Sequence, residues 1–359
     1  MIFIFFQNCI SPHQMPYIKE MANFSECERI CIVVPESDMQ SRIDMGWERQ
    51  SNKEKSSEKI EIVVSPSDNE VKELFSLYTN KGKVFCFFSG ITSFESVRKW
   101  LDISLKYDVV RNIITEAPLV YNHPLWMHRM RFVLKDYKYV RHFENVFIMG
   151  DEYVDYYKFW SRKWNVYPFM YCTEWKSRER DIVEANNLKI LFVGSLSHRK
   201  NVRLLLDASK DTEGVEIGIV GDGEQRYELE SIVEKSKLNV LFYGVKPMDD
   251  IPFIMQEYDV LVLPSLHDGW GAVVNEALTM GLYVICSDRC GAKYLLKDSR
   301  LGSIFKSGDV IDLENRIRDC LKNKSEIRST TYERIDIARG KIHGKVVAKY
   351  LLNKIGIVE

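Results

Sequence analysis

The stretch DVLVLPSLHDGWGAVVNEALTMG, residues 259–281, joins a β-strand to an α-helix through a glycine-rich turn. Its first seven residues form an apolar run of strand length, and residues 272–280 have the composition of a helix. Two carboxylates, Asp268 and Glu276, lie on either side of the Gly-Trp-Gly turn. A buried strand that leads directly into a helix is typical of a parallel sheet with helices on both faces.

The same alternation of strand and helix continues on both sides of this stretch. Helical patterns such as residues 93–108 and 226–236 separate the apolar runs, and the alternation breaks near residues 166–187. We therefore predict two Rossmann-like, doubly wound α/β domains with parallel sheets, at residues 1–170 and 171–340. The other expected strands are 2–6, 29–35, 59–65, 83–90, 109–115, 145–150, 188–194, 215–221, 239–244 and 282–288.

The composition suits a soluble globular chain with no electrostatic attraction to nucleic acid. Its 359 residues include 50 Lys plus Arg and 51 Asp plus Glu. The eight cysteines contain no Cys-x-x-Cys pair, which predicts buried free thiols in a reducing compartment. The opening MIFIFFQN is typical of a buried strand rather than a signal peptide. No apolar run approaches the roughly 18 residues that span a bilayer. We expect a cytoplasmic protein.

Loops that follow the strands of the second half are the expected ligand site, because open parallel sheets bind ligands beyond the carboxyl ends of their strands. Glycines there allow backbone N–H groups to approach a bulky ligand. The mouth of the helix after Gly271 attracts an anion, and Lys200, with Arg199 beside it, supplies a cation for a phosphate. The residues expected to line this site are Gly194, Ser195, Arg199, Lys200, Gly221, Gly223, Gly244, Val245, Gly269, Trp270, Gly271, Ala272 and Glu276.

The two acids suit a ligand that carries hydroxyl groups at both ends. Glu276 lies roughly 7 Å along the helix axis, and its carboxylate leans back toward the helix mouth, where it can accept hydrogen bonds from a ribose. Asp268 can face the other end of a diphosphate, where a sugar would lie. This pattern predicts a nucleotide-sugar site. The alternative is structural: a tight turn around a buried Trp270, with Glu276 and Lys200 in solvent.

Taken in order, these residues resemble the second-domain signature of the GT-B glycosyltransferases, specifically the retaining family 4, also called glycosyl transferases group 1. The resemblance covers about residues 188–300, and the first half matches only in its alternation of strand and helix. It implies a GT-B fold with an interdomain cleft and a last helix, within 341–359, that packs back on the N-terminal domain. The signature residues are Gly194, Lys200, Gly221, Gly223, Gly244, Pro264, Ser265, Asp268, Gly269, Trp270, Gly271 and Glu276.

The resemblance also implies roles for single residues. As catalytic candidates, Lys200 would stabilise the departing nucleotide diphosphate, Asp268 would contact the transferred sugar, and Glu276 would hold the ribose. The implied reaction is a metal-independent, front-side displacement without a cofactor, in which electrostatic stabilisation of the leaving group lowers the barrier. Three features depart from the family: Asp268 replaces a glutamate, Ser195 replaces an arginine, and the first loop, QNCISPHQMP, contains no glycine.

The first half offers two candidates for contact with the acceptor. His13 follows the first strand and Glu116 follows the strand at 109–115, although either can be an ordinary loop residue. The segment 122–143 combines aromatic residues with five basic residues and a single acid. A basic amphipathic helix can bind anionic lipid, which would favour a lipid-linked acceptor. The alternative for this segment is an ordinary solvated helix face.

The leading hypothesis is therefore a retaining, hexosyltransferase-type glycosyltransferase that transfers sugar from a nucleotide-diphosphate sugar to a glycan or lipid-linked acceptor. Its expected setting is cell-envelope or exopolysaccharide synthesis, in the cytoplasm or on the inner face of the membrane. Two alternatives remain open: a GT-B nucleotide-sugar epimerase, and a catalytically silent nucleotide-sugar-binding subunit of a polysaccharide synthesis complex. The departures at Ser195 and Asp268 keep the silent subunit open.

Overall fold

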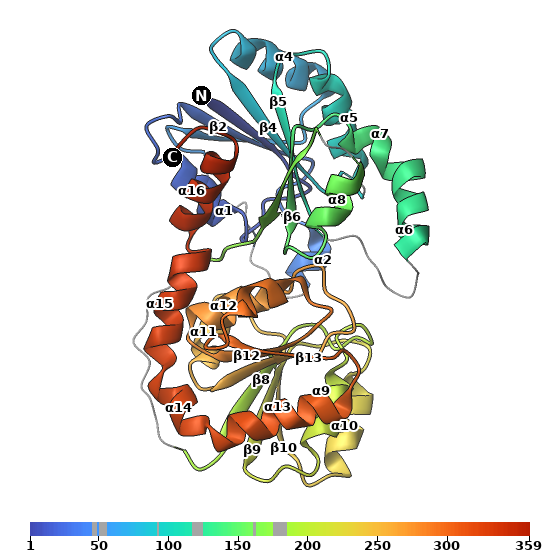
Figure 1. Cartoon of the computed structure of the whole chain (residues 1–359), viewed down its shortest axis with the longest axis vertical. Coiled ribbons are helices and arrows are strands. Elements are labelled where there is room, and N and C mark those ends of the chain that lie inside the picture. Colours follow the sequence, from blue (N-terminus) through green and yellow to red (C-terminus); the bar gives the residue numbers. More distant parts are fainter. Residues whose placement is uncertain (45–48, 50–55, 92, 117–124, 161–162, 175–184) are drawn as a thin grey trace. The chain divides into compact units, whose positions relative to one another are not determined.

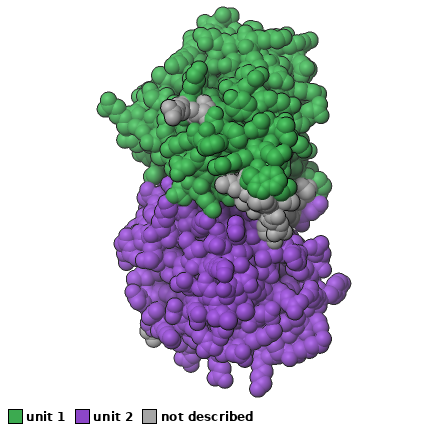
Figure 2. Space-filling model, turned by 45° about the vertical axis from the view of Figure 1, so that its right-hand side comes forward, with its two compact units in different colours: residues 1–40, 49–174, 344–359 green, residues 41–48, 175–343 purple. Residues whose placement is uncertain are grey.

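The computed structural model describes the 359-residue chain except for residues 45–48, 50–55, 92, 117–124, 161–162 and 175–184. The chain divides into two compact units, which Figure 2 colours separately. Residues 41–48, expected within the first domain, group with unit 2. Unit 1 comprises Met1–Gln40, Arg49–Glu174 and Gly344–Glu359, and unit 2 comprises Ser41–Glu48 and Trp175–His343.

Unit 1 is built on a seven-stranded parallel sheet with the strand order β3-β2-β1-β4-β5-β6-β7. Its strands are β1 (Ile2–Phe6), β2 (Arg29–Val34), β3 (Ile60–Val64), β4 (Val84–Ser89), β5 (Val110–Thr115), β6 (Asn145–Met149) and β7 (Asn165–Phe169). The first six confirm the apolar runs expected from the sequence. The prediction missed β7, which contains Pro168; this strand lies at the sheet edge, where proline is tolerated.

The central strand β1 is fully buried because its alternate side chains enter two separate layers of the core. Phe6 faces one layer, where its ring lies 5.6 Å from that of Trp100. Phe5 faces the other, where its ring centroid lies 6.3 Å from that of Tyr17. A strand with apolar contacts on both faces must be a continuous apolar run, which is why IFIFF does not alternate with polar residues.

Helices cover both faces of this sheet (Figure 1). The helices of unit 1 are α1 (Met15–Met21), α4 (Asp68–Thr79), α5 (Glu95–Ser104), α6 (Leu125–Arg131), the π-helical segment η1 (Phe132–Asp136), α7 (Tyr137–Val140), α8 (Val154–Trp160) and α16 (Gly344–Lys354). The short helix α2 (Gln40–Ile43) begins at the last residue of the first unit 1 segment and continues into the residues grouped with unit 2. A capping box, in which Ser67 and Glu70 bind each other's backbone N–H groups, fixes the start of α4. Within the described parts of the chain, no helix has both the length and the apolarity needed to cross a bilayer.

The last helix, α16, packs against α1 within unit 1 (Figure 1). The two helices approach so closely that a Cβ atom on Gly344 would lie 2.7 Å from the carbonyl oxygen of Pro16. Tyr350 donates a hydrogen bond of 2.7 Å to the carbonyl oxygen of Pro168 at the end of β7. These contacts attach the C-terminal segment to the sheet of unit 1.

Unit 2 is built on a six-stranded parallel sheet with the order β10-β9-β8-β11-β12-β13. Its strands are β8 (Leu188–Val193), β9 (Val215–Val220), β10 (Asn239–Gly244), β11 (Val260–Leu263), β12 (Tyr283–Ser287) and β13 (Gly302–Phe305). The first five confirm the predicted runs, and the prediction of a doubly wound α/β unit is confirmed in both halves. The prediction missed β13, a four-residue strand at the sheet edge.

The helices of unit 2 are α9 (Val202–Ser209), α10 (Arg226–Glu234), α11 (Ile251–Met255), α12 (Val273–Thr279), α13 (Val310–Lys322), α14 (Lys324–Ser329) and α15 (Thr331–Ile342), with the 3-10 helix η2 at Gly291–Lys297. A buried ion pair attaches α14 to the sheet. Arg328 donates two hydrogen bonds, of 3.0 and 2.8 Å, to the carboxylate of Asp259, just before β11. The same guanidinium donates to the carbonyl oxygens of Ala185 and Asn187, before β8.

Candidate functional site

The candidate site lies at the carboxyl ends of β8 and β11, two neighbouring strands whose connections run in opposite directions along the sheet. This point, where the strand order reverses, is the usual ligand site of a doubly wound sheet. The loops after the two strands are joined directly, because the backbone N–H of Leu266 donates a 2.9 Å hydrogen bond to the carbonyl oxygen of Arg199. The sequence therefore predicted correctly that these two loops are neighbours.

The centre of the site is an ion pair between Lys200, from the β8 loop, and Asp268, from the β11 loop. The side chains of Lys200 and Asp268 are only 12% and 13% exposed. Arg199 is half exposed, and its guanidinium lies 3.7 Å from the same carboxylate oxygen of Asp268. It also donates a 3.0 Å hydrogen bond to the carbonyl oxygen of His267. Two cations thus share one carboxylate, which leaves a net positive charge suited to an anionic ligand.

Asp268 is held in place by the loop that follows β12. Its backbone N–H donates to the carbonyl oxygen of Arg289 at 3.1 Å, and its own carbonyl oxygen accepts from Gly291 at the same distance. His267, the preceding residue, has a half-buried ring, and this burial lowers the pKa of its imidazole. The aspartate therefore projects from a backbone that is fixed on both sides.

Beside the ion pair, backbone hydrogen bonds join the carboxyl ends of β8, β9 and β10 to one another. Gly194 donates to the carbonyl oxygen of Val220 at 3.0 Å, and Gly221 donates to that of Gly244 at 2.8 Å. Gly221 has a φ of +126°, and a Cβ there would lie 2.0 Å from the carbonyl oxygen of Gly194. The glycine expected to admit a ligand is therefore also required for the two loops to pack together.

The Gly-Trp-Gly turn is internally fixed. Trp270 is buried, and its indole N–H donates a 2.7 Å hydrogen bond to the amide oxygen of Asn275. Gly271 has a φ of +92°, and a Cβ there would lie 2.8 Å from the side chain of Leu263. The indole thus occupies the core, as the structural alternative for this turn anticipated, and only the backbone of Trp270 remains to contact a ligand.

Glu276 lies in the first turn of α12, with its side chain half-buried. The helix begins at Val273, one residue later than expected, so Ala272 is its cap rather than its first residue. Ser195 is half-buried in the β8 loop, and Val245 is exposed after β10. The residues predicted to line the donor site therefore lie at the carboxyl ends of the unit 2 strands, in the loops that follow them, or in the first turn of α12.

The two acceptor candidates of unit 1 are connected through Tyr171, which the sequence did not single out. The ring of Tyr171 lies 6.4 Å from that of His13, and its hydroxyl donates a 3.4 Å hydrogen bond to the carboxylate of Glu116. His13 is buried, and its carbonyl oxygen accepts a hydrogen bond from the backbone N–H of Cys172. Tyr171 lies two residues after the end of the unpredicted strand β7, so no strand-end signal pointed to it.

Metal ligands were not expected from the sequence. In the parts of the chain that the structure describes, no group of three or more His, Cys, Asp or Glu side chains is arranged to hold a metal ion. The eight cysteines are all buried as thiols.

The two parallel-sheet units define a protein of the GT-B class. Solved structures share this fold: HepE from Anabaena in complex with UDP matches with a TM-score of 0.71 and 15% sequence identity, over 99% of this chain and 98% of that one. The family model of glycosyl transferases group 1 matches residues 174–336. This match confirms the resemblance to that family for the half of the chain that carries Lys200, Asp268 and Glu276.

Curated relatives match over less than half of their own length. An uncharacterized glycosyltransferase of Methanocaldococcus jannaschii is 30% identical over 144 residues, which is 40% of each chain. A Campylobacter jejuni enzyme named as an N-acetylgalactosaminyltransferase acting on a diphospho-undecaprenol-linked sugar is 28% identical over 177 residues, 45% of this chain and 46% of that one.

Proposed function

We propose that this chain is a retaining glycosyltransferase that transfers a sugar from a nucleotide-diphosphate sugar to a glycan or lipid-linked acceptor. The observation that carries the proposal is the contact between Lys200 and Asp268 at the strand-order reversal of unit 2, inside the segment that matches glycosyl transferases group 1. The relative from Campylobacter, by its name, acts on a sugar linked to diphospho-undecaprenol, which favours a lipid-linked acceptor and cell-envelope synthesis.

The charges of the site suggest how such a transfer would proceed. Lys200 and Arg199 carry two positive charges against the single negative charge of Asp268, so a bound diphosphate would be in a positively charged environment. Negative charge grows on this diphosphate as its bond to the sugar breaks, and a fixed cation stabilises that growing charge most strongly. Asp268 would then face the sugar and Glu276 the ribose. In this mechanism the two cations act in place of a metal ion.

Hydrolysis of a panel of UDP-, GDP-, ADP- and CMP-sugars, with and without lipid and glycan acceptors, is the direct test. We expect release of free nucleotide from one donor, faster with the correct acceptor, and an unchanged rate after divalent ions are removed with EDTA. Retention is measured by the anomeric configuration of the product. Isomerised nucleotide sugar without transfer would identify an epimerase instead. Binding without turnover of any donor would identify a silent subunit.

Nucleotide binding should raise the melting temperature of unit 2. At a concentration 100 times its Kd, a ligand stabilises the folded state by about 2.7 kcal/mol. For a unit of this size, that corresponds to roughly 5 to 10 °C. We expect one of UDP, GDP, ADP or CMP to produce this shift in a calorimetric scan, and the Lys200→Met variant to reduce it. Equal shifts with all four nucleotides would argue against recognition of a particular base.

Replacing Tyr171 by phenylalanine should raise the KM for the acceptor by roughly 3- to 10-fold, because the hydroxyl that orients Glu116 is lost. Donor hydrolysis without acceptor should be unchanged. Tyr107→Phe is the matched control, since its hydroxyl donates to the carbonyl oxygen of Lys72 elsewhere in unit 1. An equal effect of both substitutions would mean that Tyr171 is only structural.

A further inference from the structure

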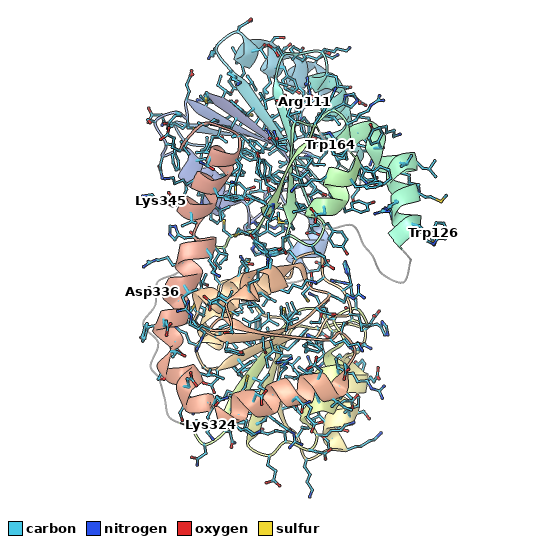
Figure 3. The ribbon with its side chains drawn as sticks, in the orientation of Figure 1. Arg111, Trp126, Trp164, Lys324, Asp336 and Lys345 are labelled. Atoms are coloured by element: carbon cyan, nitrogen blue, oxygen red, sulfur yellow. The ribbon has the colours of Figure 1, made fainter. Side chains whose placement is uncertain are left out.

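The helical segment from α6 to α7 presents a row of apolar side chains to solvent. The side chains recur at helical spacing, so they share one face of the segment. Leu134 is 71% exposed and Trp126 is 60% exposed. Figure 3 shows Trp126 at the outer end of α6, pointing away from the body of unit 1. The members of this apolar row are Trp126, Met127, Met130, Val133, Leu134 and Tyr137.

The row is held in place by an aromatic anchor on the opposite side of the same segment. Phe132 is buried, and five rings lie at centroid distances of 5.2 to 6.4 Å from its own. Four of them belong to Tyr156, Tyr157, Trp160 and Trp164, and the fifth to Tyr137, the least exposed member of the apolar row. Because Phe132 fixes the rotation of the segment, Val133 and Leu134 must face outward. Their exposure is thus a property of the folded unit and not of a loose helix end.

Basic side chains flank the apolar row. Arg129 lies over the ring of Phe159, itself 63% exposed, at 4.5 Å from the ring centroid. Residues 125–141 contain five Lys or Arg residues and one acid, Asp136. That acid is half-buried, and its burial raises the pKa of its carboxyl group. The basic residues are Arg129, Arg131, Lys135, Lys138 and Arg141.

We propose that the apolar row and its basic flanks bind the surface of an anionic lipid bilayer. A large exposed apolar patch marks an interaction site. A helix face that pairs tryptophan, methionine and leucine with Arg and Lys suits the boundary between headgroups and acyl chains. The apolar side chains would enter that boundary while the basic ones contact anionic headgroups. This surface would bring unit 1 to a lipid-linked acceptor, and in that respect the inference rests on the proposed function. Binding to the lipid surface itself does not depend on that function.

Co-flotation with vesicles of 70% phosphatidylcholine and 30% phosphatidylglycerol tests this surface. We expect the full chain to float with these vesicles, to float poorly with pure phosphatidylcholine, and to dissociate as salt rises. Leu134→Glu should lower the partition coefficient at least tenfold. The Lys135→Glu and Lys138→Glu double variant should lower it on the order of 100-fold. Brominated lipids should quench tryptophan fluorescence, and Trp126→Phe should remove that quenching.

Matched substitutions elsewhere on unit 1 separate this surface from general effects. Leu77→Glu changes another exposed leucine, and Lys99→Glu with Lys106→Glu makes the same change in net charge. Both controls should float like the unchanged protein. The proposal fails if the unchanged protein does not bind anionic vesicles, or if controls and row variants lose binding equally. Self-association that Leu134→Glu abolishes, without vesicle binding, would assign the row to a second copy. Donor hydrolysis is measured in parallel, so failure of this surface is distinct from failure of the proposed function.

Discussion

Replacing Lys200 by methionine is expected to lower kcat for sugar transfer by roughly 100- to 1,000-fold, the effect typical of removing one preorganised group that stabilises developing charge. Lys200 is largely buried beside Asp268, so water cannot readily replace its ammonium group. Methionine retains most of the length of the side chain and removes only the charge. The donor KM should change much less than kcat, because the charge grows mainly in the transition state.

Arg199→Met is the matched control for this prediction. Arg199 approaches the same carboxylate, but it is half exposed and lies 3.7 Å away, so solvent screens its charge. We expect it to lower kcat less than tenfold. Lys200→Arg should restore part of the activity that methionine loses. If the activity of Lys200→Met stays within threefold of the unchanged protein, with a normal melting temperature, the proposed role of Lys200 is wrong.

Replacing Asp259 by leucine is expected to lower the free energy of unfolding of unit 2 by roughly 3 to 5 kcal/mol. The substitution leaves the guanidinium of Arg328 buried without its carboxylate. It also removes an acceptor from the backbone N–H of Lys189 at the start of β8. Urea denaturation followed by circular dichroism measures the loss. The site loops lie at the other end of the strands, so kcat at low temperature should be unchanged.

A double substitution gives this prediction its internal control. Asp259→Leu combined with Arg328→Met removes both charges, and apolar replacement of a whole buried pair is often neutral or stabilising. The double variant should therefore be more stable than either single variant. Glu314→Gln removes a partner of the more exposed Arg318 and should cost no more than about 1 kcal/mol. If the losses of the two single variants simply add, the pair is not coupled as the structure indicates.

Central strands were predictable because they have apolar contacts on both faces. The central run at Ile2–Phe6 has the predicted bounds, and so does one edge strand, Asn239–Gly244, which is six residues long and contains no proline. The two missed strands, β7 and β13, are also edge strands, where a strand pairs on one side only and its sequence is less constrained. Proline in one and a length of four residues in the other removed the usual signal.

The candidate site was predictable as a set of loops but not as a set of contacts. The positions of Lys200 and Asp268 after their strands predicted that both lie beyond the carboxyl ends of the strands of one sheet. It did not predict that they form an ion pair, because 68 residues separate them and the contact depends on how the two loops fold. The same limit applies to Tyr171, whose ring and hydroxyl connect His13 with Glu116.

The sequence by itself determined the class of fold, the parallel sheets and the placement of the site at the carboxyl ends of the strands. Each of these follows from local periodicity and from the residues that come directly after each strand. Only the tertiary structure decided which side chains are available there. It buried Trp270, paired Lys200 with Asp268, and turned Leu134 outward by burying Phe132. The physical reason is that burial and charge pairing depend on contacts between segments distant along the chain, which local patterns do not specify.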